Sequence, residues 1–210
     1  RPAVAPTNSC EPVLGTNPFA IGVPSDEPFP FLIDCATSVL QRGNFEVLER
    51  KTDSVYVKDS VIFSEGKEDY CHPKEVLDQL KSAKAALRTI GGHKGYGLSV
   101  AIEIFCSAFQ SGDFLKQLNG FYEGGEKRPY NIGHFFLAIN PDNFIEIEAF
   151  KKNVGDVMRQ LKESKAVGEE EVLVPGEKEY YSKQEKLKEG ISVGSVLMEE
   201  LECLGFLCNN

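Results

Sequence analysis

A glycine-rich turn at residues 91–97 runs directly into the apolar segment 98–109, whose only charged side chain is Glu103. A helix that is apolar on nearly all sides is predicted to be buried at the centre of a core. The chain of 210 residues is long enough for such a core, since roughly 70% of the unfolded surface disappears when a domain of this size folds. The pattern therefore favours a globular domain with one central helix that is entered through a turn of glycines.

The residues before this helix predict short strands and one amphipathic helix. Residues 19–23 and 31–35 are strand-like and are separated by a proline-bounded loop, as in a hairpin, and shorter strand candidates follow at 55–57 and 61–63. Pro73 marks the first turn of a helix that covers the core from outside. The apolar stripe of this helix consists of Val76, Leu77, Leu80, Ala83 and Leu87.

The residues after the central helix continue the alternation of strands and helices. A continuous apolar run at 132–139 predicts a strand that is covered on both faces. Further along, the pattern predicts an amphipathic helix at 144–164, a charged helix that opens at 175–177 and ends at 189, a short strand at 191–193 and a helix capped by Ser195 that ends near Leu207. We therefore expect an α/β fold with a mixed, largely antiparallel sheet and flanking helices. We expect residues 1–190 to form one domain and residues 191–210 to be an appended strand and helix.

Charge and cysteine usage exclude several classes of protein. Thirty-two acidic against 23 basic residues give a net charge of −9, which argues against a nucleic-acid-binding surface. No apolar run reaches the roughly 18 residues that a membrane-spanning helix needs. The six cysteines lack CxxC spacing and indicate reduced thiols, hence a cytoplasmic protein. Because the first residues are neither a signal peptide nor a transit peptide, we expect the chain to be the later part of a longer polypeptide.

The glycine turn is a candidate anion site. Glycines at the start of a helix let backbone N–H groups approach a phosphate or carboxylate, and Lys94 adds a positive charge there. The turn matches neither GxxxxGK[ST] nor GxGxxG. The alternative is a tight loop required for close packing of the helix on a strand, with Lys94 in solvent.

The segment 34–38 (DCATS) is the second candidate site. It places a carboxylate at the end of a strand and two hydroxyl groups at a helix start, where open α/β sheets bind ligands. Asp34 can accept hydrogen bonds from ribose hydroxyls, and the backbone N–H groups of Thr37 and Ser38 can hold a phosphate. The alternative is an ordinary helix N-cap at Thr37 or Ser38.

Few other side chains suggest chemistry. His72 follows Cys71 in a polar loop and makes a poor metal site, so no metal is predicted. His134 lies in the apolar run and is typical of a hydrogen-bonded core residue, whereas His93 shares the glycine turn. Glu103 is either a buried carboxylate with a partner or a residue that turns one face of its helix outward.

Five motifs in this order resemble the type-2 malate/L-lactate dehydrogenase family, which includes malate, lactate, sulfolactate and ureidoglycolate dehydrogenases and cyclic imino-acid reductases. The motifs are 14–20 (LGTNPFA), 33–38 (IDCATS) with Arg42 and Gly43 after it, 91–98 (GGHKGYGL), 131–136 (NIGHFF) and 174–177 (VPGE). They span nearly the whole chain. Such a set is more specific than any single motif.

The resemblance implies an oxidoreductase that uses NAD or NADP, has a nucleotide-binding domain unlike the Rossmann fold, and forms a homodimer. It implies cofactor contacts from Asp34, Ala36, Thr37, Lys94, Gly176 and Glu177. It places Thr16, Asn17, His93 and His134 at the edge of the site, with the substrate. The chain departs from the family pattern between Tyr56 and Leu87. The family's catalytic histidine would lie upstream of Arg1, and His93 is a poor substitute for it.

The expected reaction is hydride transfer between the nicotinamide and C2 of a small 2-hydroxy or 2-oxo acid such as malate or lactate. One alternative is a catalytically inactive relative that acts as a cofactor-binding or interaction module. Another is a phosphate-ligand enzyme, such as a transferase, that uses the Lys94 turn.

Overall fold

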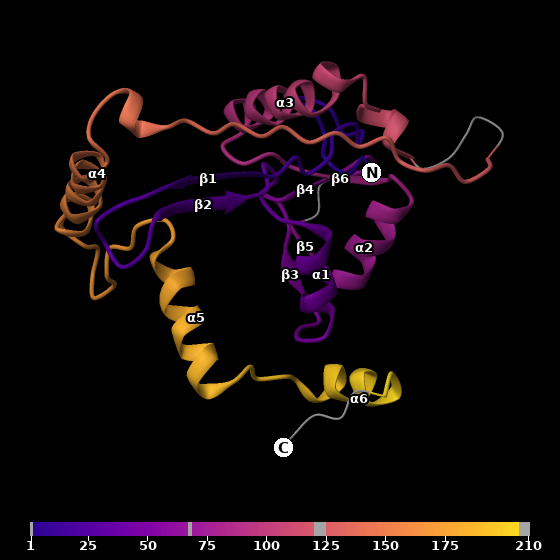
Figure 1. Cartoon of the computed structure of the whole chain (residues 1–210). Helices are drawn as coiled ribbons and strands as arrows, with labels where there is room; N and C mark the ends of the chain where they lie inside the picture. The colour runs from indigo at the N-terminus through magenta and orange to yellow at the C-terminus, as the bar shows by residue number, and fades with distance from the viewer. Residues whose placement is uncertain (1, 67–68, 120–124, 206–210) are drawn as a thin grey trace. The chain divides into compact units, whose positions relative to one another are not determined.

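A computed structural model describes residues 2–66, 69–119 and 125–205 (Figure 1). Within these ranges the chain divides into two compact units. The first comprises Arg1–Ala20 and Asp34–Ala138, and the second Ile21–Ile33 and Ile139–Asn210. The strands β1 (Phe19–Val23) and β2 (Phe31–Cys35) pair with each other and contain the points where the chain passes from one unit to the other.

Two small antiparallel sheets form in the first unit. β3 (Val55–Tyr56) pairs with β5 (Tyr70–Cys71), and β4 (Val61–Phe63) pairs with β6 (Ala85–Leu87) in a register that sets Val61 opposite Leu87. Single bridges from Val4 to Leu14 and Leu87 attach the N-terminal segment. The expected mixed α/β class is confirmed, and the described residues form three two-stranded sheets in place of one larger sheet.

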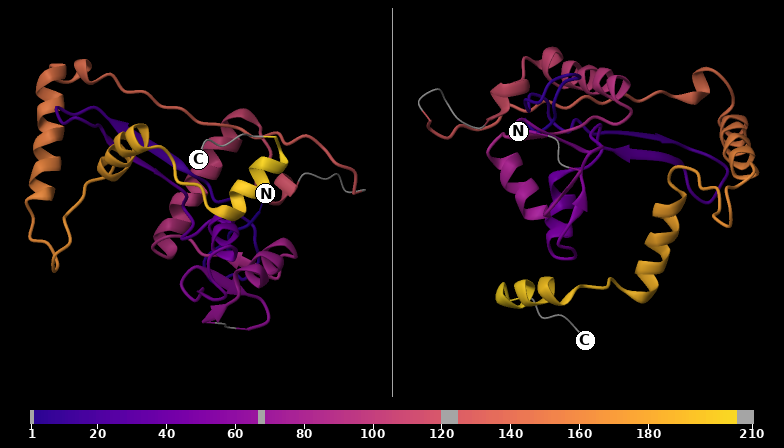
Figure 2. Two further views of the ribbon diagram at one scale, coloured as in Figure 1. Left: turned by 90° about the horizontal axis from the view of Figure 1, so that it is seen from below. Right: turned by 180° about the vertical axis from the view of Figure 1, so that it is seen from behind.

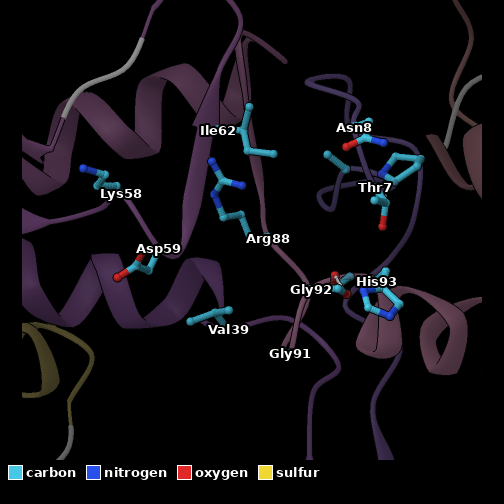
Figure 3. Close-up of a pocket in the computed structure, with 13 residues that line it drawn as sticks. Thr7, Asn8, Val39, Lys58, Asp59, Ile62, Arg88, Gly91, Gly92 and His93 are labelled. Carbon is cyan, nitrogen blue, oxygen red and sulfur yellow. Dashed lines mark hydrogen bonds between the residues drawn. The ribbon is translucent and has the colours of Figure 1, made fainter.

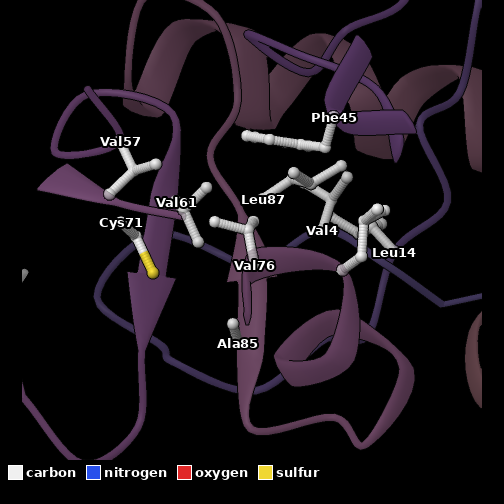
Figure 4. Packing of buried hydrophobic residues seen from close by; sticks show 10 residues of the cluster. Val4, Leu14, Phe45, Val57, Val61, Cys71, Val76, Ala85 and Leu87 are labelled. Atoms are coloured by element: carbon white, nitrogen blue, oxygen red, sulfur yellow. The ribbon is translucent and has the colours of Figure 1, made fainter. Parts of the chain in front are cut away.

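The core of the first unit lies between these sheets and two helices, α1 (Arg42–Glu49) and α2 (Pro73–Lys81) (Figure 4). Its ten buried members are Val4, Leu14, Phe45, Val57, Val61, Cys71, Val76, Leu77, Ala85 and Leu87. Burial of a side chain such as Phe45 or Val76 stabilises the fold by about 1.5–3 kcal/mol relative to its exposure.

Both helix boundaries in this region correct the sequence-based prediction. α2 begins at Pro73 as expected but ends at Lys81, because Ala83 adopts a left-handed φ of 56° and the following residues pair as β6. α1 begins after Gln41, whose backbone N–H donates to Asn44, so neither Thr37 nor Ser38 is its N-cap.

The predicted central helix is α3 (His93–Ser107), which is followed by the 3₁₀ turns η1 (Ala108–Gln110) and η2 (Leu115–Asn119). The prediction of burial on all sides is wrong for the described chain, because only Gly95, Ser99 and Ser107 of α3 are buried. Its outer face exposes Leu98, Ile104 and Phe105. These apolar side chains are at least partly exposed among the described residues.

The apolar run at 132–139 also differs from its prediction. It is an extended segment that forms no strand among the described residues, and Phe136 is 89% exposed. Figures 1 and 2 show the part of it that lies in the first unit passing beside the C-terminal end of α3. Phe135 stacks on Phe105 with ring centroids 4.9 Å apart. The Phe135 side chain therefore packs on α3, and the backbone of the segment is unpaired with any described strand.

The second unit contains η3 (Pro141–Asn143), α4 (Ile147–Lys162), α5 (Glu177–Glu189) and α6 (Ser195–Cys203). Its small core consists of Phe29, Met158 and Val174. α4 and α5 agree with the predicted helices. Residues 191–193 are not a strand, and α6 is capped by Gly194, not Ser195, and ends at Cys203.

An ion-pair network holds the loop between β1 and β2 to α4. The Arg159 guanidinium contacts the carboxylates of Asp26, Glu27 and Asp156. The hydrogen bonds that Arg159 donates to Asp26, Asp156 and Glu27 raise the pKa of Arg159 above its ordinary value. Those that Arg159 and Lys152 donate to Asp156 lower the pKa of Asp156. None of the helices in the described ranges is long and apolar enough to cross a membrane.

Candidate functional site

Thr37 connects three of the sequence motifs. Its backbone N–H donates to the carbonyl oxygen of Thr16 at 2.9 Å, and its hydroxyl donates to the carbonyls of Thr16 and Asn17 at 3.0 and 3.1 Å. Its own carbonyl accepts from the backbone N–H of Ile90 at 2.9 Å, directly before the glycine turn. The segments 14–20 and 33–38 and the residue directly before 91–98 therefore meet at Thr37, whose side chain is fully buried.

Asn17 adds a second connection to α3. Its amide nitrogen donates to the carbonyl of Ser99 at 2.9 Å and to the Glu103 carboxylate at 2.8 Å. The other oxygen of Glu103 accepts from the backbone N–H of Leu115 at 2.7 Å. Glu103 is thus a half-buried carboxylate with partners, which decides between the two interpretations of this residue.

The glycine turn has a structural feature of each of the two predicted alternatives, close packing and an open backbone. Gly95 packs so closely that an added Cβ would lie well within 3.0 Å of the Ile90 carbonyl oxygen, so this glycine is required for packing. Gly91 and Gly92 have φ values of 57° and 62° and have no atom within 4 Å of an added Cβ. Their backbone is therefore open to a ligand at the N-terminus of α3.

A cavity of about 610 Å³ lies beside Gly91 and Gly92 (Figure 3). Its side chains come from the N-terminal segment, the β3–β4 turn, β4 and the residues after β6. The lining comprises Ala5, Pro6, Thr7, Asn8, Val39, Lys58, Asp59, Ile62, Arg88, Thr89, Gly91, Gly92 and His93. The Thr89 hydroxyl donates to the carbonyl of Gly92 at 2.9 Å and fixes the turn at the cavity wall.

The sequence predicts the turn but not most of the residues that line this cavity. Of the predicted residues, His93 lines it, whereas Lys94 and Asp34 are exposed side chains outside its lining. Ala36 is buried next to Thr37. Arg88 could have been noticed as a cation between an apolar strand and the glycine turn. Thr7, Asn8, Lys58 and Asp59 carry no such signal, because only tertiary folding brings them together.

The other candidate histidines have different surroundings. His72 accepts from the backbone N–H of Lys74 at 3.1 Å and caps α2. His134 is exposed, so its interpretation as a core residue is wrong, and its ring lies 6.3 Å from that of Phe136. Within the described ranges, no group of three His, Cys, Asp or Glu side chains could hold a metal ion.

Gly176 and Glu177 lie in the second unit, where both have structural contacts. Gly176 has a φ of 96° and an added Cβ would lie 2.8 Å from the carbonyl oxygen of Pro30. The Glu177 side chain is 3% exposed, pairs with Lys162 and accepts from the backbone N–H of Val174 at 3.2 Å. The hydrogen bond to Glu177 raises the pKa of Lys162. This carboxylate is therefore already occupied by protein partners.

Comparison with known proteins agrees with this arrangement of motifs. The family model for malate/L-lactate dehydrogenases matches residues 1–202. The chain belongs to this family. Its fold matches a malate dehydrogenase from Entamoeba histolytica with a TM-score of 0.88 and 39% identity, over 98% of this chain and 58% of that one.

Two curated relatives of this family member are also named dehydrogenases. A malate dehydrogenase from Pyrococcus horikoshii is 34% identical over 208 residues, 96% of this chain and 55% of that protein. A malate/(S)-sulfolactate dehydrogenase from Methanothermus fervidus is 31% identical over 202 residues, 96% of this chain and 55% of that protein. The chain spans about half the length of the curated relatives it matches.

Proposed function

We propose that this family member is an oxidoreductase that transfers a hydride between the nicotinamide of NAD or NADP and C2 of a small 2-hydroxy or 2-oxo acid. The observation that carries the proposal is the family match over residues 1–202, together with the hydrogen bonds that join Thr37 to the segment 14–20 and to Ile90, directly before the glycine turn. The names of the relatives, malate and sulfolactate dehydrogenases, point to the same class of acid. From the resemblance we also propose a cytoplasmic homodimer.

The residues of the first unit fit a dinucleotide. The left-handed backbone at Gly91 and Gly92 leaves open space where other residues would carry a Cβ, so a phosphate can approach the N–H groups that begin α3. Lys94 and Asp34 are exposed. An ammonium group suits a phosphate and a carboxylate suits ribose hydroxyls.

Each proposed contact has a distinct role. Lys94 would bind phosphate, Asp34 would accept from a ribose, and Thr37 with Ala36 would position Asp34, since the Thr37 hydroxyl is already donated to Thr16 and Asn17. Gly176 and Glu177 would contact the cofactor through the backbone of their turn, because the Glu177 carboxylate is already paired.

The acid substrate is proposed to bind in the cavity beside the glycine turn. Thr16, Asn17 and His134 do not line this cavity, and we propose them at the edge of the substrate site. Bound nicotinamide supplies or accepts the hydride at C4. Among the described residues, His93 lines the cavity and is proposed to exchange a proton with the oxygen on C2. The prediction of a further histidine upstream of Arg1 remains a prediction.

Dinucleotide binding gives a direct test of this proposal. With NADH or NADPH at about 100 times its Kd, the free energy of unfolding should rise by roughly 2.7 kcal/mol, seen as an increase in Tm by calorimetry. ADP-ribose, which lacks the nicotinamide, should stabilise the protein less than NADH. Equal stabilisation by both compounds would favour a phosphate-ligand enzyme. No change in Tm with either nicotinamide cofactor at millimolar concentration would contradict the proposal.

A further inference from the structure

Arg88 is held in a fixed position at the wall of the cavity. It directly follows β6, and its backbone N–H donates to the carbonyl of Ser60 at 2.8 Å. Its backbone carbonyl accepts from the N–H of Val39 at 2.9 Å. Anchored on both sides by neighbouring segments, the Arg88 backbone presents its side chain from a rigid part of the first unit.

The guanidinium of Arg88 is only partly used by the protein. Its Nε donates to the carbonyl of Val61 at 3.3 Å, which orients the planar group. Within the described residues no carboxylate pairs with Arg88, whereas Lys58 in the same cavity pairs with Asp69 at 3.5 Å. Figure 3 shows the guanidinium extending toward Ile62, with the Asp59 side chain turned away from it. A half-buried cation therefore remains uncompensated in the cavity.

We infer that Arg88 binds a carboxylate of the acid substrate through its two terminal nitrogens, Nη1 and Nη2. Because the Nε–H group donates to the carbonyl of Val61, the N–H groups on Nη1 and Nη2 remain as donors. Two such parallel N–H groups match the two oxygens of a carboxylate. The N-terminus of α3, with Gly92 and His93 in the same lining, adds positive potential. The inference rests on the proposed function and adds the group that recognises the acid.

A cofactor phosphate is a second source of the same oxyanion chemistry, so the test must separate the two. The substrate carboxylate is the favoured anion because Arg88 and His93 line the same cavity. A carboxylate bound to Arg88 would then lie in the same cavity as the side chain proposed to exchange the proton. A substrate anchor predicts that changing Arg88 weakens acid binding and leaves dinucleotide binding unchanged. A phosphate anchor predicts the reverse.

The first experiment uses malonate as a probe and does not depend on turnover. Malonate is titrated calorimetrically, at constant ionic strength, into the wild-type protein and the variants Arg88→Met, Arg88→Lys and Arg42→Met. Arg88→Met should weaken malonate binding roughly 10- to 100-fold, and Arg88→Lys should be intermediate because it keeps the charge but not the fork. Arg42, which pairs with Glu46 on α1 outside the cavity, is the matched control and should leave binding unchanged. Absence of malonate binding to the wild type, or equal binding by Arg88→Met, would overturn the inference.

The second experiment separates this inference from the proposed function. In the full-length protein, Arg88→Met should raise KM for the acid roughly 10- to 100-fold while the Kd for NADH stays within twofold. If the wild type turns over and Arg88→Met has an unchanged KM, only the role of Arg88 is wrong. If Arg88→Met loses NADH affinity and keeps its KM, the anion is a cofactor phosphate. If malonate binding depends on Arg88 but no acid is oxidised or reduced, the proposed function fails and the anion site remains.

Discussion

Replacing Gly95 with alanine is expected to lower the free energy of unfolding by about 3 kcal/mol. The added methyl group would lie well within 3.0 Å of the Ile90 carbonyl oxygen and close to the Ile90 carbonyl carbon. Both are backbone atoms of the segment that Thr37 holds, since the N–H of Ile90 donates to the Thr37 carbonyl at 2.9 Å. Neither side can move freely, so α3 must shift away from the turn.

Gly97 provides a matched control two residues further along α3. An added Cβ there meets no atom within 4 Å, so Gly97→Ala should be neutral or stabilise the protein by up to about 1 kcal/mol through helix propensity. Urea unfolding followed by circular dichroism measures both variants. Equal stability of Gly95→Ala and Gly97→Ala would show that the close approach at Ile90 is wrong.

Replacing Lys94 with methionine is expected to weaken NADH or NADPH binding about tenfold without changing Tm. Lys94 is the second residue of α3 and is exposed, so its loss removes a charge near the proposed phosphate without disturbing the core. The difference between wild type and variant should shrink as salt is raised, because ions screen an exposed charge. Titration of NADH fluorescence at two salt concentrations measures both effects.

Lys74 is the corresponding control, because it is also exposed and also the second residue of its helix, α2. Lys74→Met should leave the Kd for the dinucleotide unchanged, since α2 begins with Pro73 and not with open glycines. An equal loss of affinity in both variants would mean that Lys94 acts only through the protein's net charge. Unchanged affinity in Lys94→Met would remove it from the cofactor site.

Local sequence predicted the elements that have their own start and stop residues. Pro73 and the Pro175-Gly176 turn mark the beginnings of α2 and α5, and both helices start there. β6 was missed because Ala83 and Leu87 continue the helical spacing of α2, and only the left-handed backbone at Ala83 shows the break. Periodicity alone does not report that local change of conformation.

Apolarity alone also misled the prediction at α3 and at 132–139. A run of apolar residues indicates that a surface can be buried, but it does not specify what covers it or whether the backbone pairs. The motifs around Thr37 were recognisable because their residues are contiguous. The cavity was not, since Asn8, Lys58 and Arg88 come from distant segments that only the core brings together.

Transfer of deuterium from the cofactor tests the proposed activity most directly. The protein is incubated with NADH or NADPH that carries deuterium at both C4 positions of the nicotinamide, together with oxaloacetate, pyruvate or sulfopyruvate. The hydroxy acid is analysed by mass spectrometry and proton NMR. We expect one of these acids to acquire deuterium at C2, in an amount equal to the cofactor oxidised. Bound cofactor with no deuterium at C2 of any of the three acids, above a protein-free control, would contradict hydride transfer by this protein.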